Sequence, residues 1–229
     1  MELYLVRHAQ SYNNHVADAT KRQHDPPLTE LGERQAYRVG HYLAHEASKC
    51  PITRERPTDG FGLNRLYCSA HFRCLKTADY IARHTGLDPE IWVDVHEEMG
   101  IYLDGVDVLP GMTPAEIREQ FPRVKVPDDM PVDGWWNRPV EQKHEWEARA
   151  ARVAKILREE MAHLDERIAI VTHGGFIRDL LSELITGGPR SGEAFVTQNT
   201  SVHRIDFTAD SVLVRYLNRV EHLPAKLVS

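Results

Sequence analysis

The chain has 229 residues, of which 41% are hydrophobic and 27% are charged, and its formal net charge is -6 at pH 7. This length suits one α/β domain or at most two small ones, and the composition is typical of a soluble globular protein rather than a disordered or membrane protein. A surplus of acidic residues argues against a general nucleic-acid-binding protein, because a phosphate backbone is held largely through a cationic surface. We therefore expect one domain over residues 1–229 and no nucleic-acid partner.

Targeting and metal-binding signals are weak. The apolar stretch that begins at Leu3 stops before Arg7, far short of a signal sequence or of a membrane span of roughly 20 residues, so we expect a cytoplasmic protein with no membrane partner. The odd number of cysteines includes no CxxC pair and predicts reduced, partly buried thiols. The histidines outside the strand ends lack metal-ligand spacing, so we expect no metal site. Those residues are Cys50, Cys68, Cys74, His15, His24, His41, His45, His84, His144 and His163.

The first predicted element is a short strand that starts at Leu3 and ends in Arg7 and His8. A polar turn follows, carrying Gln10, Ser11 and Asn14. A histidine released at the end of a buried strand, next to a permanent cation, is placed to meet phosphate. Taken alone, the pattern is weak, because a histidine at this kind of position is more often a surface residue or one satisfied within the fold.

A helix is predicted next, capped by Thr29 and with apolar residues from Leu31 to Leu43 at helical spacing. Residues 51–62 are rich in Pro, Gly and charge, which predicts a loop. A second strand, residues 63–69, leads into a helix over residues 71–84 that carries Arg73 and stops at Gly86. A third strand over residues 90–95 then delivers His96, Glu97 and Glu98.

A long irregular excursion follows. Six prolines lie between Gly100 and Pro139, and a capping box at Thr113 predicts one short helix up to Phe121. Segments of this length in compact domains tend to form lids or binding loops, so residues 101–143 are predicted to be a lid that determines specificity. An amphipathic helix is predicted over residues 140–164.

The last third of the chain contains a second apolar run that ends in a histidine. Arg167 to Thr172 is a continuous apolar run, typical of a central parallel strand, and it ends in His173 and a glycine pair. A helix from Phe176 to Ile185 and an antiparallel hairpin of residues 201–207 and 211–217 complete the predictions. Strands that alternate with helices predict an α/β fold, a three-layer αβα sandwich with a mostly parallel central sheet and the excursion over the carboxyl ends of its strands.

Four predicted strands end in reactive side chains, and the carboxyl ends of strands in an open α/β sheet are where ligands bind. Arginine supplies planar, always-charged donors for phosphate oxygens, and the backbone amides of Gly174 and Gly175 begin a helix and can add more. This set suits phosphoryl transfer without a metal. The four groups are Arg7 with His8, Arg73, Glu97, and His173.

The ordered series of motifs resembles the histidine phosphatase superfamily, also called the phosphoglycerate mutase-like family. Its hallmark Arg-His-Gly motif is matched with Ala9 in place of glycine. The remaining matches extend through most of the chain: Gln10, Ser11 and Asn14, then residues 27–32 with Gln35 and Ala36, then Ser69 to Ala78, then residues 172–175 with Ile177 and Arg178, and finally Asn199 to Ser201.

The resemblance implies roles for particular residues. His8 is the nucleophile that becomes phosphorylated, while Arg7, Asn14, Arg73, His173 and Gly174 hold the phosphate. Glu97 is the general acid and base, although Glu98 fits the same pattern. Gln10 and Ser11 are further candidates near the phosphate. The resemblance implies no metal and no other cofactor, and its substrate is a small phosphorylated molecule.

Several departures bear on the reaction. Mutases of this family carry Glu-Arg-His-Tyr-Gly at the acid and a Gly-Trp after the first motif, whereas here the acid is followed by Glu98, Met99 and Gly100 and no Trp lies between Asn14 and Leu28. Hydrolysis of a phosphomonoester is therefore the first hypothesis and mutase activity the second. A non-catalytic module that binds phosphorylated ligands is a distant third, because both histidines are present.

Substrate choice is predicted to reside in the excursion. The adjacent Trp135 and Trp136 either pack it onto the body, the interpretation we favour, or wall the pocket against an apolar or ring-bearing substrate. Arg138 is a candidate, with other cations of the excursion, for binding a second anionic group. The sequence leaves the physiological substrate open, and it is compatible with either a monomer or a homo-oligomer.

Overall fold

The computed structural model describes residues 1–46, 60–106, 108–192 and 194–229. The central feature is a sheet with the strand order β3-β2-β4-β1-β5-β6. The strands β1 to β4 run parallel, and β5 and β6 are antiparallel to their neighbours. Their bounds are β1 Glu2–Arg7, β2 Arg65–Cys68, β3 Glu90–Ile91, β4 Arg167–Thr172, β5 Val202–Phe207 and β6 Val212–Arg219.

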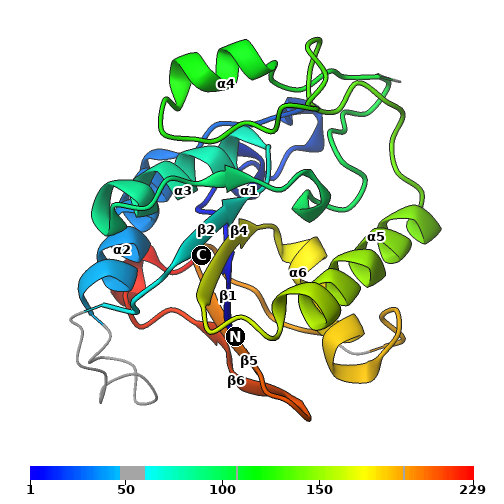
Figure 1. Ribbon diagram of the computed structural model, residues 1–229. Helices are drawn as coiled ribbons and strands as arrows, with labels where there is room; N and C mark the ends of the chain where they lie inside the picture. Colours follow the sequence, from blue (N-terminus) through cyan, green and yellow to red (C-terminus); the bar gives the residue numbers. More distant parts are fainter. Residues whose placement is uncertain (47–59, 107, 193) are drawn as a thin grey trace.

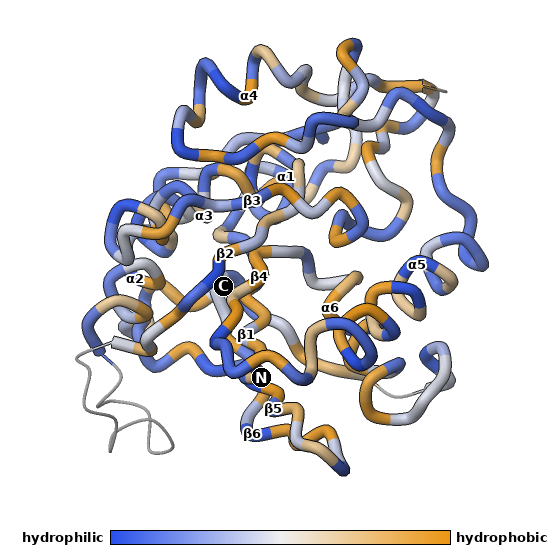
Figure 2. The backbone as a smooth tube through the Cα atoms, in the orientation of Figure 1, coloured by the Kyte–Doolittle hydropathy of each residue, from blue (hydrophilic) through white to orange (hydrophobic). Residues whose placement is uncertain are grey.

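Helices cover both faces of the sheet, which makes three layers (Figure 1). On one side lie α2 (Glu30–His45) and α3 (Phe72–Thr85), and on the other α5 (Lys143–Ile156) and α6 (Gly174–Thr186). The predicted αβα sandwich is confirmed. The tube in Figure 2 is hydrophobic along β1 and β4 and more hydrophilic on the outer helix faces, as expected for strands that are buried on both sides.

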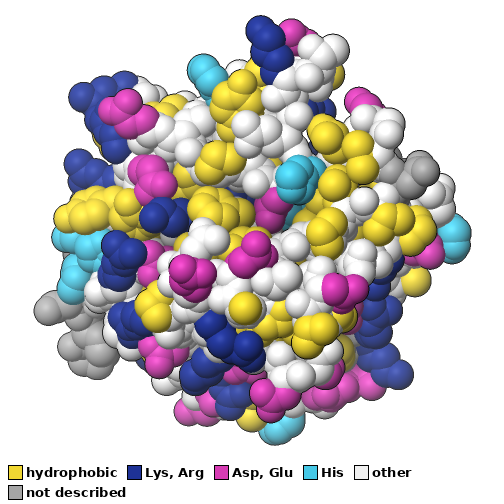
Figure 3. All heavy atoms as spheres, turned by 90° about the horizontal axis from the view of Figure 1, so that it is seen from above, with side chains coloured by type: hydrophobic (Ala, Val, Ile, Leu, Met, Phe, Trp, Pro, Cys, Tyr) yellow, Lys and Arg dark blue, Asp and Glu magenta, His cyan; other side chains and the backbone are white. Residues whose placement is uncertain are grey.

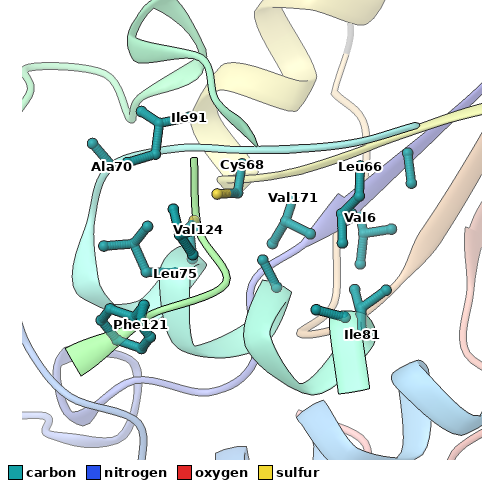
Figure 4. Packing of buried hydrophobic residues seen from close by; sticks show 14 of the residues in the cluster. Val6, Leu66, Cys68, Ala70, Leu75, Ile81, Ile91, Phe121, Val124 and Val171 are labelled. Carbon is teal, nitrogen blue, oxygen red and sulfur yellow. The ribbon is translucent and has the colours of Figure 1, made fainter. Parts of the chain in front are cut away.

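The alternation of side chains along β1 assigns each residue to one of two cores. Tyr4 and Val6 pack in the core under α2 and α3, whereas Leu3 and Leu5 pack in the core under α5 and α6. Figure 4 shows the first core, with Val6 and Val171 from the sheet facing Ile81 of α3. Because side chains of a strand alternate between faces, a one-residue slip would exchange the two sets. The packing of the two cores therefore fixes the register between neighbouring strands, and with it the alignment of their carboxyl ends.

Two predicted elements differ from the structure. The third strand stops at Ile91, and Val93–Val95 forms a short 3-10 helix. The strand lies at the edge of the sheet. In the residues that follow it, the Arg149 guanidinium donates to the carbonyls of Asp94 and His96, each at 2.9 Å. These carbonyls are therefore turned out of the strand pattern.

The helix expected over residues 140–164 begins later. Gln142 and Glu145 form a capping box, and the α-helix runs only from Lys143 to Ile156 before a π-helical turn, Leu157–Met161. Other boundaries agree closely with the sequence: Gly86 ends α3 in a left-handed conformation with a φ of 81°, and Thr113 caps α4 (Pro114–Gln120).

The excursion lies over the carboxyl ends of the parallel strands, where Figure 1 shows α4 and its flanking segments. The short helix α1 (Tyr12–His15) lies at the same end, directly after β1. Most of the loop predicted over residues 51–62, together with Cys50, lies outside the described residues. Within the described part of the chain, no helix is long and apolar enough to cross a bilayer.

Candidate active site

A small cavity of about 180 Å³ opens at the carboxyl ends of β1 and β4. It gathers side chains from segments that are far apart in the sequence, among them the end of β1, the start of α3 and the residues after Val95. The lining residues are Arg7, His8, Ser11, Asn13, Asn14, His24, Pro26, His71, Arg73, Glu97, Glu98, Met99, Gly100 and Tyr102.

His8 is buried at this cavity, with 2% of its surface exposed. Its Nδ1 lies 2.7 Å from the carbonyl of Ala9, and its Nε2 lies 3.2 Å from Nε of Arg73. A carbonyl only accepts and a guanidinium only donates, so Nδ1 carries the proton and Nε2 presents its lone pair. Burial, and then the charges of Arg73 and Arg7, lower the pKa of His8 well below its ordinary value. The imidazole is therefore neutral.

Arg73 connects His8 to His173. Its Nη2 lies 3.0 Å from Nδ1 of His173, whose Nε2 lies 2.9 Å from Oγ of Ser69. Burial and the Arg73 charge also lower the pKa of His173 well below the usual value. The ring of His173 lies edge-on to that of His8, with centroids 5.1 Å apart. A single guanidinium therefore holds two neutral imidazoles in fixed positions.

Asp25, which the sequence did not single out, supports Arg73 from behind. Both carboxylate oxygens accept the amide of Phe72, each at 3.1 Å, and Oδ1 lies 3.7 Å from Nη1 of Arg73. His71 is the N-cap residue of α3 but makes no side-chain capping bond, so Asp25 takes that role from a distant loop. Burial raises the pKa of Asp25 to about 6. The only sequence signal was an acid just before a proline pair.

Arg7 is held by the chain on its other side. Its Nη1 donates to the carbonyl of Thr197 at 2.5 Å, while its buried Nε has no hydrogen-bond partner among the described residues. A side chain at Gly174 would meet Oγ1 of Thr197 at 2.9 Å and Nε of Arg7 at 3.3 Å. The glycine therefore allows the close packing of α6 against Arg7. Burial lowers the pKa of Arg7, and the guanidinium remains charged at neutral pH.

Two adjacent carboxylates complete the cavity. Oε1 of Glu97 accepts the amide of Phe176 at 3.0 Å, and Oε2 lies 3.5 Å from the amide of Gly175. A Cβ at Gly175 would lie 2.5 Å from Glu97 Oε1, so glycine is required for this approach. The sequence predicted that the Gly174–Gly175 amides would face phosphate. In the structure, the Gly175 amide faces Glu97 instead, because the carboxylate occupies the positive end of α6.

Glu98 is placed differently from Glu97. Its Oε1 lies 3.3 Å from Nη2 of Arg190, and the Nε of the same arginine lies 3.3 Å from Asp179. Burial, with Glu97 and Asp179 nearby, raises the pKa of Glu98 to about 7. Thus Glu97 is the residue tied to the helix amides, and Glu98 is the one inclined to hold a proton near neutral pH.

The polar turn after β1 is internally bonded. Oδ1 of Asn14 accepts from Ser11 N at 3.2 Å, Ser11 Oγ at 3.1 Å and Asn199 Nδ2 at 3.2 Å. This orientation leaves the Asn14 amide nitrogen as the end that can donate to a ligand. Gln10 is not among the lining residues, and its Oε1 accepts Thr29 Oγ1 at 2.7 Å. Gln10 therefore anchors the start of α2.

The two specificity candidates in the excursion lie away from the cavity lining. Trp136 has only 4% of its surface exposed and lies edge-on to His96, with ring centroids 4.9 Å apart. Arg138 stacks over the Trp136 ring at 4.1 Å, and its Nη2 lies 3.3 Å from Nε2 of His96. This arrangement favours packing over a pocket wall, and it engages the cation that was a candidate for a second anion.

Three of the histidines expected to be dispersed come together on the outer faces of α2 and α3. The ring of His41 lies 5.0 Å from that of His45 and 5.8 Å from that of His84. His41 and His45 are one turn apart on α2, and the packing of α3 against α2 brings His84 beside them. The positions in the sequence do not show which residues of two helices will meet. Over residues 1–46, 60–106, 108–192 and 194–229, no group of three or more His, Cys, Asp or Glu side chains is arranged to hold a metal ion.

Comparison with known structures gives a consistent fold. A mycobacterial glucosyl-3-phosphoglycerate phosphatase is similar at 21% identity and a TM-score of 0.60, over 96% of this chain and 99% of that one. The phosphoserine phosphatase of Entamoeba histolytica has 18% identity and a TM-score of 0.60, with coverages of 97% and 99%. The ecdysone phosphate phosphatase of Bombix mori has 14% identity and a TM-score of 0.67, with coverages of 98% and 95%.

A comparison with curated proteins gives no significant match. The family model that describes the histidine phosphatase superfamily (branch 1) matches residues 3–220. This match includes the ends of β1 and β4 and every residue that lines the cavity. The expectation from the motifs is confirmed, and the chain belongs to branch 1 of the histidine phosphatase superfamily.

Proposed function

We propose that this protein is a phosphatase that hydrolyses a phosphomonoester through a phosphohistidine on His8. The observation that carries the proposal is the neutral imidazole of His8, whose Nε2 accepts Nε of Arg73 in a cavity that is also lined by Arg7. A neutral imidazole is a nucleophile, and two guanidinium groups neutralise charge on the phosphoryl oxygens. The Ala9 carbonyl supports this tautomer by accepting the proton of Nδ1.

In the first half of the proposed reaction, Nε2 of His8 bonds to phosphorus while the bond between phosphorus and the leaving oxygen breaks. Arg73 exchanges its contact with Nε2 for phosphoryl oxygens. The unpartnered Nε of Arg7 and the amide nitrogen of Asn14 add donors at the same group. Catalysis then consists mainly of positioning and charge stabilisation, as phosphoryl transfer generally requires.

His173 and Gly174 complete the proposed phosphate site. His173 orients Arg73 before the substrate arrives. When Arg73 turns toward the phosphoryl oxygens, Nδ1 of His173 is released. In the neutral tautomer whose Nε2 accepts the Ser69 hydroxyl, Nδ1 carries the proton and donates to a nonbridging oxygen as negative charge develops there. Gly174 leaves its backbone amide accessible beside Arg7.

Glu97 is assigned as the general acid and base. It gives a proton to the leaving oxygen, and in the second half it takes a proton from water while that water attacks phosphorus and the bond to His8 breaks. Orthophosphate leaves, and His8 returns to its neutral form. The place of Glu97 in the cavity lining with His8, in a position fixed by the amides of Gly175 and Phe176, supports this assignment. The raised pKa of Glu98 supports the alternative assignment, and leaving-group dependence separates the two, as described in the Discussion.

The test is a phosphate-release screen over sugar phosphates, phosphoglycerates, nucleotides, aryl phosphates and phosphopeptides in excess chelator. We expect turnover of at least one class by the wild type and none by His8→Ala. Turnover that persists in His8→Ala would refute the phosphohistidine route, and turnover abolished by the chelator would refute a metal-independent mechanism. Transfer of phosphate between positions of a phosphoglycerate, with little net release, would favour a mutase.

A further inference from the structure

We propose that the site selects monoesters of uncharged, partly apolar alcohols or phenols and discriminates against esters that carry a second anionic group. This inference rests on the proposed phosphatase function and assigns the class of its leaving group. It follows from three features of the described cavity: the charges in its lining, the pairing of the nearby arginines, and the side chains at its rim.

The described lining of the cavity contains no arginine beyond those that the phosphoryl group uses. The lining contains two arginines, Arg7 and Arg73, and two carboxylates, Glu97 and Glu98. In the proposed reaction, both arginines bind the phosphoryl group. Of the two histidines beyond the catalytic one, His71 is fully buried with a pKa held well below its ordinary value by burial and Arg73, so it stays neutral. A carboxylate on the leaving group would therefore find no arginine or lysine among the described lining residues that is free to pair with it.

Two cations just outside the lining, Arg190 and Arg138, are already engaged. Arg190 forms ion pairs with Glu98 and Asp179, at 3.3 Å each. Arg138 lies over the Trp136 ring and beside His96. Moving either arginine to a substrate anion would leave half-buried carboxylates or an exposed indole face behind, which costs free energy. The positive charge of Arg178 works to lower the pKa of Glu98 and of Asp179, but Arg178 does not line the cavity.

The rim of the cavity is apolar on the side of the excursion. Pro26, Met99 and Tyr102 line it, and 39% of the Tyr102 surface is exposed. Val106 and Val108 continue the same segment and are exposed by 38% and 44%. Exposed apolar side chains next to a polar cavity are typical of a ligand site with an apolar part. Figure 3, seen from above α4, shows hydrophobic side chains beside acidic and basic ones on this face.

The backbone holds this rim in place. Met99 and Gly100 both have positive φ angles, 68° and 76°, a conformation that ordinary residues rarely adopt. A Cβ at Gly100 would lie 2.1 Å from the Trp136 ring. Trp136 therefore acts on the site indirectly, by packing under the turn that presents Met99 and Tyr102. The cavity, at about 180 Å³, is smaller than a typical site for a whole ligand, so the leaving group extends along this rim.

The test compares two pairs of substrates that differ by one carboxylate: phenyl phosphate with 4-carboxyphenyl phosphate, and glycerol 3-phosphate with 3-phosphoglycerate. We expect kcat/KM to be about tenfold or more lower for the carboxylated member of each pair, because a carboxylate that loses hydration without gaining a cationic partner costs at least this factor. We also expect phenyl phosphate to exceed glycerol 3-phosphate. Equal or higher kcat/KM for the carboxylated members would overturn the inference while leaving the phosphatase proposal standing.

A positive charge added at the rim tests whether the leaving group lies there. Tyr102→Arg introduces a cation in the lining, and we expect it to reduce the preference against 4-carboxyphenyl phosphate severalfold. Val106→Arg adds the same charge to the same segment outside the lining and should leave the preference unchanged. If both variants change the preference equally, the effect is a general surface field and the rim assignment is wrong. Inactivity of the wild type towards every ester would instead refute the phosphatase proposal, and the inference with it.

Discussion

Nε of Arg73 donates to Nε2 of His8 across 3.2 Å, which places a permanent cation on the lone pair of the proposed nucleophile. The same guanidinium reaches His173 at 3.0 Å and is backed by Asp25 at 3.7 Å. The planar fork of arginine makes these contacts at once, whereas a lysine ammonium is a single point. The geometry of Arg73 is thus set before phosphate binds, and burial together with the Arg73 charge lowers the pKa of His8 and keeps it neutral.

Replacing this fork is expected to damage catalysis even when the charge is kept. Arg73→Lys should lower kcat/KM by about 10²-fold or more, and Arg73→Ala by more still, because donors aimed at a phosphoryl group are worth about this factor. The measurement is steady-state kinetics on an aryl phosphate, with the exposed Arg83→Lys on the same helix as control. Wild-type kcat/KM in Arg73→Lys would show that charge alone suffices.

Asp25 gives stability a defined pH dependence. Its pKa is about 6 in the folded protein against an ordinary value of 3.8 for an aspartate, so the folded state binds the proton more tightly. The carboxyl therefore stabilises the fold most below about pH 4, and this contribution is lost as the pH rises through about 6. In Asp25→Asn, a neutral carboxamide replaces the carboxyl group, and its oxygen can still accept the hydrogen bond from the Phe72 amide.

The difference in unfolding free energy between Asp25→Asn and the wild type should thus shift in favour of the variant by about 2 kcal/mol between about pH 4.5 and about pH 7.5. Urea unfolding at both pH values measures it, with Asp210→Asn in the exposed hairpin turn as control. A shift in the opposite direction would mean that the Arg73 ion pair, rather than burial, dominates the environment of Asp25.

The two adjacent acids are separated by leaving-group dependence. If Glu97 protonates the leaving oxygen, Glu97→Gln should lower kcat for an alkyl phosphate by about 10²-fold to 10⁴-fold and much less for p-nitrophenyl phosphate, whose leaving group needs no proton. Glu98→Gln should affect both esters alike. The reverse pattern would assign the acid to Glu98, whose pKa is raised to about 7.

Trp136 is expected to affect stability far more than substrate choice. Trp136→Ala should lower the free energy of unfolding by about 3–5 kcal/mol, because it leaves a cavity under the turn at Gly100. If the variant stays folded at low temperature, the order of kcat/KM across the phosphate-ester screen should be retained, with lower values throughout. A changed order with an unaltered melting temperature would restore the pocket-wall interpretation.

Much of this arrangement was predictable from the sequence, and the reason is topological. His8 and His173 each follow a continuous apolar run, and β1 and β4 are parallel neighbours with Arg7 opposite Thr172. Parallel strands end at one edge of a sheet, so the two histidines had to meet there. The helix that carries Arg73 follows a strand on the other side of β4 and reaches the same edge.

What the sequence could not supply depends on contacts between distant segments. Asp25 acts on Phe72 and Arg73 across a loop, and no local pattern links these positions. Glu97 takes the amides at the start of α6 because Gly175 leaves room for a carboxylate from another segment. The early end of β3 likewise depends on Arg149, which lies far along the chain and binds the carbonyls after it.

The most direct test of the central claim is to trap the phosphoenzyme. We expect protein mixed with a ³²P-labelled ester and quenched in alkali within one turnover to carry label that is stable to alkali, is lost in acid, and maps to the peptide that contains His8. His8→Ala should carry none. Phosphate release by the wild type without such label, or label on a different residue, would contradict the assignment of His8 as the nucleophile.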